Sequence, residues 1–225
     1  MSDQRFRDRA SAGDLLAKAV AGRSFERPVV YALPRGGVPV AAPIAAAIGA
    51  PLDLLMVRKL GVPWQPELAA GSIVDGERPD LILNEDIVRA AGLSSAALKA
   101  LGDAELKEIE RRRAIYLPER AAVPAQGKTA ILVDDGIATG ASMRAAITAV
   151  RRRSPLRIVV AVPVASRETV EALSAVVEDV ICLITPADFR AVGYHYDDFH
   201  QLDDREVISL LAGVARRAEA KERPQ

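Results

Sequence analysis

Two adjacent carboxylates are followed by a turn that contains glycines and hydroxyl groups. Asp134 and Asp135 come directly after the apolar run 130–133, and residues 136–142 then lead into a stretch with helical spacing. A glycine-containing turn at the start of a helix presents unpaired backbone amides, which together with hydroxyls can bind a phosphate dianion. The carboxylates would repel a phosphate but can accept hydrogen bonds from sugar hydroxyls. Ribose 5-phosphate satisfies both demands.

This arrangement resembles the signature of the type I phosphoribosyltransferases. In that family an apolar strand, an acidic pair and a loop with Thr-Gly follow one another, as they do here from Ile131 to Met143. The resemblance implies that the donor 5-phosphoribosyl-1-pyrophosphate binds with its ribose, or with its Mg²⁺, at Asp134 and Asp135. It also implies that five loop residues bind the 5-phosphate, namely Ala138, Thr139, Gly140, Ala141 and Ser142.

A second glycine-rich turn follows the first strand expected in the chain. Arg35, Gly36 and Gly37 lie between the apolar run 29–33 and a helix of mostly small residues that begins near Val38. Glycines let backbone amides approach an oxyanion closely, and the arginine adds positive charge. The resembled family has a loop at this place that binds the donor's pyrophosphate, and we expect the same role here.

Two cations stand at the end of the next apolar run. Arg58 and Lys59 belong to the segment 57–67, whose glycine and prolines predict a loop. The resembled family carries a mobile loop at this place that closes over the pyrophosphate. We expect Arg58 to bind the donor and Lys59 to act in catalysis, because a basic loop that closes would neutralise the leaving group and exclude water.

The segment 185–199 resembles the Val-Gly-Tyr-x-x-Asp stretch of the hypoxanthine-guanine phosphoribosyltransferases. The resemblance implies a small hood that holds the acceptor base, with Asp197 near the metal. Phe189, Tyr194 or Tyr196 would stack on that base, a contact worth about 1–3 kcal/mol in nucleic-acid binders. An aromatic cluster that merely completes the core is an equally weighted alternative.

Two departures from the 6-oxopurine enzymes leave the acceptor open. Those enzymes place an acid before Thr-Gly, where this chain has Ala138, and a lysine after the following strand, where this chain offers only Arg167. The general base is therefore unassigned. The expected reaction is transfer of the phosphoribosyl group to a nitrogenous base, with a nucleobase of the salvage type favoured. The alternative is a regulator or accessory protein that binds phosphoribosyl ligands without turnover.

The helices and strands predicted to position these residues indicate an α/β fold. Short, continuously apolar runs predict strands buried on both faces, and segments with helical spacing lie between several of them. Strand alternating with helix implies a mainly parallel twisted sheet flanked by helices. The runs are 29–33, 52–57, 130–133, 158–162 and 180–184.

One long helix interrupts this alternation, because apolar residues recur near the helical period across 98–116. We expect a helical insertion over about 84–120 that packs outside the sheet. Hood segments near both termini would complete a single domain over 1–215. The last helix is expected over about 203–215, and the polar residues 216–225 predict a disordered tail.

Charge and hydropathy restrict the partners. Thirty basic residues balance thirty acidic ones, so the chain lacks the basic field expected of a nucleic-acid-binding protein. The longest apolar stretch is interrupted by prolines, a glycine and an aspartate, and residues 1–12 do not form a signal peptide. We therefore expect a cytoplasmic protein with no nucleic-acid or membrane partner. The sequence does not decide the oligomeric state, and a homodimer stays open.

Overall fold

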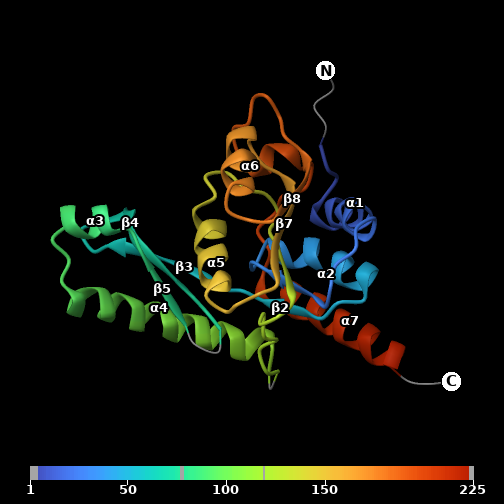
Figure 1. Cartoon of the computed structure of the whole chain (residues 1–225), viewed down its shortest axis with the longest axis horizontal. Coiled ribbons are helices and arrows are strands. Elements are labelled where there is room, and N and C mark those ends of the chain that lie inside the picture. The colour runs from blue at the N-terminus through green and yellow to red at the C-terminus, as the bar shows by residue number, and fades with distance from the viewer. Residues whose placement is uncertain (1–4, 77–78, 119, 223–225) are drawn as a thin grey trace.

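A computed structural model describes residues 5–76, 79–118 and 120–222 of the chain. Its body is a five-stranded sheet in the order β2-β1-β6-β7-β8, in which every neighbouring pair is parallel (Figure 1). The predicted α/β fold with a mainly parallel sheet is confirmed. The strands are β1 (Pro28–Ala32), β2 (Leu52–Leu54), β6 (Thr129–Val133), β7 (Arg157–Val164) and β8 (Asp179–Ile184).

Helices cover both faces of this sheet. The residues of β6 are buried throughout, as the continuous apolar run predicts for a central strand. One apolar cluster joins the sheet to α1 (Arg9–Ala21), α2 (Gly37–Ile48) and α7 (Asp204–Glu222), and a second joins it to α5 (Ala141–Arg151) and α6 (Arg167–Ser174). Both apolar faces are thereby removed from water, which holds the strand ends in fixed relative positions.

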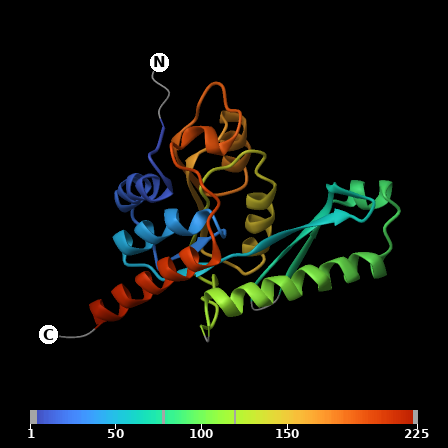
Figure 2. The ribbon, with the colours of Figure 1, turned by 180° about the vertical axis from the view of Figure 1, so that it is seen from behind.

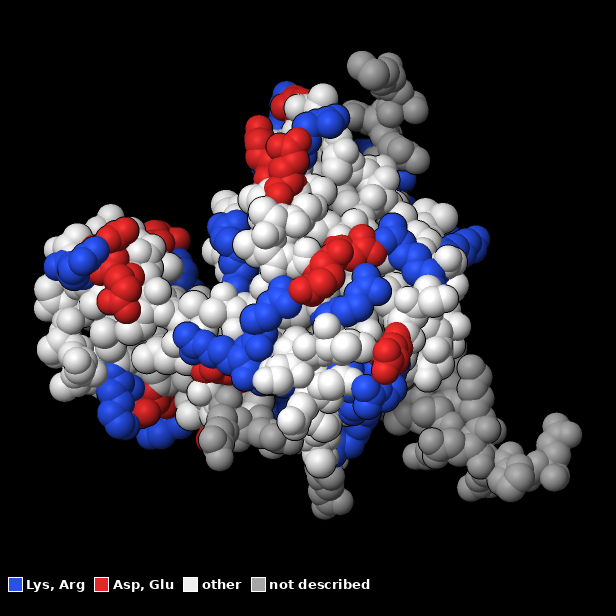
Figure 3. Space-filling model, in the orientation of Figure 1, with Lys and Arg blue, Asp and Glu red and all other residues white. Residues whose placement is uncertain are grey.

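A second, antiparallel sheet forms an arm on the body. Its strands β3 (Val57–Val62), β4 (Gln65–Val74) and β5 (Asp80–Leu83) pair in that order, and the chain continues into α3 (Glu85–Ala90) and α4 (Ser95–Tyr116). We call residues 57–116 the arm. Figures 1 and 2 show it projecting sideways from the body, with the long helix α4 running along its sheet. Figure 3 shows a notch between the arm and the body on the face drawn there.

The prediction of a loop over 57–67 is wrong, because this segment forms the β3–β4 hairpin with only two residues between the strands. The pairing shifts register on both sides of Gly61, as at a β-bulge. Such a bulge breaks the period-two alternation that marks a strand in a sequence. Because of the bulge and the prolines, the sequence of this hairpin resembles that of a loop.

The two terminal regions meet at one end of the sheet. We call residues 185–203 the hood segment; it contains the 3₁₀ turn η1 (Val192–His195). The N-terminal Phe6 pairs with Tyr196 in a parallel bridge, and the backbone amide of Phe6 donates to the carbonyl of His195 at 2.8 Å. This contact packs the N-terminal residues against the hood segment.

Helix α7 runs from Asp204 to Glu222, so the predicted end at 215 and the disordered tail from 216 onward are wrong for residues 216–222. Residues 223–225 lie outside the described part of the chain. Good helix formers, chiefly alanine, arginine, lysine and glutamate, make up residues 216–222 and favour continuation of the helix. In the described ranges, no helix combines the length and apolar character that crossing a lipid bilayer requires.

Candidate active site

The two sequence motifs meet at one edge of the parallel sheet. Strands β1 and β6 are neighbours with Ala32 opposite Val133, and the amide of Leu33 donates to the carbonyl of Val133 at 2.9 Å. The turn after β1 and the acidic pair after β6 therefore start side by side. Ligands of open α/β sheets bind at such carboxyl ends of strands.

Gly36 and Gly37 let the first turn pack against the acidic pair. A Cβ atom on Gly36 would overlap the Asp135 carboxylate, and one on Gly37 would lie 2.5 Å from the Val133 carbonyl oxygen. Both are closer than real Cβ contacts, so this approach requires glycine. The peptide bond between Pro34 and Arg35 is cis. The turn that was predicted to bind pyrophosphate thus lies against the side chain that was predicted to hold ribose.

The loop after the acidic pair leads into α5 through residues whose backbone amides have no protein acceptor among the described residues. Gly140 adopts the left-handed conformation (φ 74°) at the N-cap of α5 and supplies no side-chain cap. In the described part of the chain, no protein acceptor bonds the backbone amides of Thr139 through Ser142. The positive end of a helix dipole with free amides attracts an anion.

The carbonyl groups of the same loop are held from the opposite side. The Thr169 hydroxyl donates to the Ala138 carbonyl and the Arg144 guanidinium donates to the Thr139 carbonyl, both at 2.8 Å. The Ile137 amide donates to the Val164 carbonyl at 2.9 Å. These bonds fix the loop to the end of β7 and to α6, so an anion would meet an arranged backbone.

Burial and electrostatic repulsion shift the pKa values of the acidic pair. Burial, reinforced by the adjacent Asp135, raises the pKa of Asp134 well above its ordinary value. Burial also raises the pKa of Asp135, but the Arg9 guanidinium, whose Nε lies 2.6 Å from Asp135 Oδ2, opposes that rise. The Tyr196 hydroxyl donates to the Asp135 carbonyl at 2.5 Å. The pair is thus desolvated, with one cation and one hydroxyl in contact with Asp135.

The hood segment packs directly on this edge of the sheet. A Cβ on Gly136, in the loop after the acidic pair, would lie 2.5 Å from a methyl carbon of Val192. Tyr196 is only 1% exposed and its ring packs between Phe6 and Phe199. It has no free face for a base, so the prediction that Tyr196 stacks on the acceptor is wrong and the core alternative holds for this residue.

The other two aromatics of the hood segment are more accessible. Tyr194 is 65% exposed, and Phe189 is half-buried with its ring stacked on His195 at a centroid distance of 5.6 Å. An exposed ring can still offer a face to a ligand, whereas Phe189 already uses one face. The acceptor roles of both stay predictions.

Comparisons with known proteins agree with this geometry. The family model of the phosphoribosyl transferase domain matches residues 9–198. This chain belongs to that family. The "Putative phosphoribosyl transferase Rv0571c" of Mycobacterium tuberculosis (strain ATCC 25618 / H37Rv) is 45% identical over 206 residues, which are 92% of this chain and 46% of that protein. The chain therefore spans about half the length of the curated relatives it matches.

A solved structure resembles most of the chain of this phosphoribosyl transferase domain. The crystal structure of TT1426 from Thermus thermophilus has 43% sequence identity and a TM-score of 0.77. The match covers 93% of this chain and 98% of that chain. The arm and the hood segment therefore lie within a fold that a relative shares over nearly its full length.

The cations that were predicted to bind pyrophosphate do not gather at the acidic pair of this domain. Arg58 and Lys59 lie on β3 in the arm, where each has a carboxylate partner: Arg58 lies 2.7 Å from Glu105, and Lys59 lies 3.4 Å from Glu67. Arg35 stands on the turn after β1 but its side chain lies 3.7 Å from Asp204 at the start of α7. Their binding roles stay predictions that require these pairs to open.

The three carboxylates predicted to hold metal do not come together. The Asp197 side chain is 61% exposed and lies 3.2 Å from Arg5. No group of three or more His, Cys, Asp or Glu side chains suited to a metal ion occurs in the residues described. Mg²⁺ is commonly held by one or two carboxylates together with substrate phosphates and water. Asp134 and Asp135 fit that pattern, so they would hold Mg²⁺ together with a pyrophosphate ligand.

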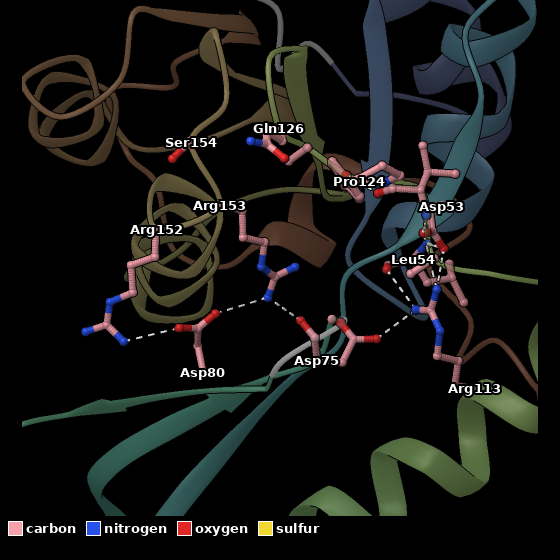
Figure 4. A pocket seen from close by; sticks show the side chains of 15 residues that line it. Asp53, Leu54, Asp75, Asp80, Arg113, Pro124, Gln126, Arg152, Arg153 and Ser154 are labelled. Atoms are coloured by element: carbon pink, nitrogen blue, oxygen red, sulfur yellow. Dashed lines mark hydrogen bonds and ion pairs between the residues drawn. The ribbon is translucent and has the colours of Figure 1, made fainter.

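A cavity of about 440 Å³ lies at the base of the arm (Figure 4), and neither Asp134 nor Asp135 is among the residues that line it. Arg113 of α4 donates to Asp53 of β2 and to Asp75 after β4, each at 2.9 Å, and Arg153, just after α5, donates to the Asp75 carbonyl. The arginines that line the cavity already have carboxylate partners, because Arg152 and Arg153 both lie near Asp80. We call the ion pairs around this cavity the joint between the arm and the body.

Sequence reasoning missed Arg9 altogether. Arg9 is the first residue of α1 and its partner Asp135 is 126 positions away. The residues around Arg9 alternate charged and small types, which suggested only a polar terminus. No local pattern could have connected the two residues, since only the packing of α1 on the sheet brings them together.

Proposed function

We propose that this chain transfers the 5-phosphoribosyl group of 5-phosphoribosyl-1-pyrophosphate to a nitrogen atom of a base and releases pyrophosphate. One observation carries the proposal: an acidic pair, a Gly-Gly turn and a row of free helix amides meet at one edge of the sheet. Membership of the phosphoribosyl transferase domain family supports the same reaction class.

Each part of the donor has a chemically matched partner in this proposal. The 5-phosphate accepts hydrogen bonds from the amides and hydroxyls of Thr139 through Ser142 at the start of α5. The ribose hydroxyls donate to Asp134 and Asp135. The pyrophosphate binds the backbone amide of Gly36, and the positive charge of Arg35 supports it, whereas the Gly37 amide already donates to the Leu33 carbonyl at 2.9 Å.

The reaction breaks the bond between the anomeric carbon and the pyrophosphate oxygen, and that electron pair leaves with the pyrophosphate. Positive charge then develops on the ribose, and a negative carboxylate such as Asp135 stabilises it. A nitrogen of the acceptor forms the new bond from the opposite face, and the configuration at the anomeric carbon inverts. Mg²⁺ bound with the donor would neutralise part of the pyrophosphate charge.

We further propose that the acceptor is a nucleobase that enters beneath the hood segment. The exposed ring of Tyr194 and the half-buried ring of Phe189 supply apolar surface for a flat heterocycle. The loop places Ala138 at the position where the 6-oxopurine enzymes carry an acid, so the acceptor's ring proton needs another receiver, such as water.

A regulator that binds phosphoribosyl ligands without turnover is the second candidate. The observation that favours it is the pairing of Arg58 and Lys59 with carboxylates inside the arm, since paired cations contribute less to the leaving group. A regulator needs only the anion-binding amides and the acidic pair, both of which lie in the body.

Donor labelled in the ribose distinguishes the two candidates. The full chain is incubated with Mg²⁺, the labelled donor and single purine or pyrimidine bases, and nucleotide, pyrophosphate and ribose 5-phosphate are quantified. Calorimetry with the donor alone runs in parallel. A transferase forms nucleotide with a subset of bases, whereas a regulator binds the donor and forms none. Absence of both binding and turnover would contradict both candidates.

A further inference from the structure

We propose that Arg9 is a positioning residue that fixes the Asp135 carboxylate for the donor's ribose and couples that carboxylate to the hood segment. The inference rests on the proposed function, because it assigns a role to Arg9 at the same donor site. Arg9 does not touch the donor in this proposal. It acts through Asp135.

Arg9 joins three segments that are distant in the sequence. Its Nε donates to Asp135 Oδ2 at 2.6 Å, and Nη1 donates to the carbonyl of His200 at 2.9 Å. The guanidinium carbon lies 3.8 Å from the centroid of the Phe199 ring. One planar cation thereby connects α1, the end of β6 and the hood segment, using an ion pair, a hydrogen bond and a cation–π contact.

The interaction is shielded from water. The Arg9 side chain is 10% exposed and the Asp135 side chain 14% exposed. An exposed ion pair contributes little because water screens it, but a buried pair cannot lose one partner without leaving an unsolvated charge. Among the described residues, Arg9 is the one cation paired with either member of the acidic pair. Its loss would therefore alter the acidic pair itself.

Both ends of the ion pair are held in place. Asp8 caps α1 by accepting from the Ser11 amide at 2.7 Å, and the Ser11 hydroxyl accepts from the Asp8 amide, so the backbone next to Arg9 is fixed. On the other side, Tyr196 holds the Asp135 carbonyl and Gly36 lies against the Asp135 carboxylate. With Arg9 and Gly36 both against Oδ2, the carboxylate cannot turn without losing a bond or meeting the backbone.

The packing of α1 does not depend on this arginine. The helix buries Ala12, Leu16 and Val20 in the apolar clusters of the body. These apolar contacts do not involve the Arg9 ion pair, so the role of Arg9 can be tested in the intact chain.

The test is a double-mutant cycle on the full chain. Donor affinity with Mg²⁺ is measured by calorimetry for the wild type, Arg9→Gln, Asp135→Asn and the double variant. Because residues in one ion pair couple strongly, Arg9→Gln should weaken donor binding about tenfold or more in the wild-type background and less than about threefold in the Asp135→Asn background. Arg9→Lys keeps a cation near Asp135 and should restore at least half of the lost binding free energy.

Arg7→Gln is the matched control, since Arg7 lies two residues away, is 78% exposed and pairs with Asp8. It should bind the donor like the wild type. Should Arg9→Gln fail to fold, as judged by circular dichroism, Phe199→Leu removes the ring beneath the guanidinium without changing a charge. Its effect on donor affinity should likewise shrink in the Asp135→Asn background.

Separate results overturn the inference and the proposed function. If the wild type binds the donor but Arg9→Gln, or its substitute Phe199→Leu, loses the same factor with and without Asp135, then Arg9 is a structural residue only. An Arg9→Lys variant as weak as Arg9→Gln also contradicts positioning by charge. If the wild type does not bind the donor, the proposed function fails and the donor role of Arg9 fails with it.

Discussion

At the residue scale, the acidic pair shows how a site can bury two carboxyl groups side by side. Asp134 accepts a hydrogen bond from the Asp135 amide, and Asp135 is paired with Arg9. Desolvation and repulsion together hold the pKa of Asp134 well above its usual range. A ligand that brings hydroxyl donors or a cation would therefore relieve a cost already present in the fold.

Replacing Asp135 with Asn should weaken donor binding or turnover. A hydrogen bond to a charged group is worth about 1.5–3 kcal/mol, so the expected loss is roughly tenfold to 150-fold. Calorimetry with donor and Mg²⁺ measures the affinity, and a thermal melt confirms that the variant is folded. A folded Asp135→Asn protein with undiminished affinity would remove Asp135 from the donor site.

An anion should occupy the start of α5 when the protein is crystallised with sulfate or phosphate and no donor. The amides of Thr139 through Ser142 are free of protein acceptors in the described structure, and the helix dipole adds attraction. The electron density at this loop is the measurement. A well-ordered loop without an anion at high sulfate concentration would contradict the phosphate assignment.

At the element scale, the turn after β1 and the strand β6 are fitted to each other through two glycines with different neighbours. The atom that opposes Gly36 belongs to a side chain, that of Asp135, whereas the atom that opposes Gly37 belongs to the backbone of Val133. A side chain can rotate, but a central strand cannot shift without disturbing its neighbours. Replacement of each glycine with alanine should therefore affect donor affinity and stability to different extents at the two positions.

We expect Gly36→Ala to lower donor affinity more than stability, because the new methyl group displaces the Asp135 carboxylate. Gly37→Ala should instead destabilise the fold by about 1–3 kcal/mol, since it presses on the β6 backbone. Urea unfolding and donor titration on both variants separate the two effects. Equal losses of stability, with equal donor affinity, would contradict this account of the turn.

The proposed part of the arm in the reaction depends mainly on Lys59. If the chain is a transferase, Lys59 stabilises charge that grows on the departing pyrophosphate, so the contact is stronger in the transition state than in the bound donor. Lys59→Ala should then lower kcat by more than it weakens donor affinity. Single-turnover rates beside donor titrations provide the comparison.

Glu67→Gln is the control for this experiment, because Glu67 is the 96% exposed partner of Lys59 and its loss keeps the cation. It should leave kcat close to that of the wild type. An unchanged kcat in Lys59→Ala, with equal losses in donor affinity and kcat/KM, would remove the catalytic role of Lys59.

At the scale of the whole molecule, the arm is attached to the body through a buried ionic joint. Arg113 of α4 serves two carboxylates, Asp53 and Asp75, which are 2% and 3% exposed. Burial raises the pKa of Asp75 to about 6, and the Arg113 guanidinium opposes that rise. Asp75 is therefore the group of the joint whose ionisation would link arm attachment to pH.

The stability of the joint should fall as the pH rises. A carboxyl whose pKa is higher in the folded than in the unfolded state stabilises the fold fully below its unfolded value near 3.8, and this contribution is lost as the pH passes about 6. The loss amounts to about 3 kcal/mol for Asp75. Urea unfolding of the wild type and Asp75→Asn between pH 4 and 7 measures it. The difference between the two free energies of unfolding should change across this range, and parallel profiles would contradict the account.

Features that depend on neighbours along the chain could be predicted from the amino-acid sequence. Continuous apolar runs specified all five parallel strands, because a strand buried on both faces needs apolar side chains throughout. The acidic pair, the Gly-Gly turn and the start of α5 were also readable, since a strand end, a turn and a helix start are local events within a few residues.

Which distant residues share the site depends on the packing of elements that are far apart in the sequence. The bulged hairpin of the arm, the burial of Tyr196 and the pairing of Arg9 with Asp135 leave no periodic trace in the sequence. Periodicity reports which side of an element faces the core, but it does not report which residue of another element lies opposite. The packing of α1 and the hood segment on the end of β6 makes that choice, because it excludes water from the acidic pair and places one cation against it.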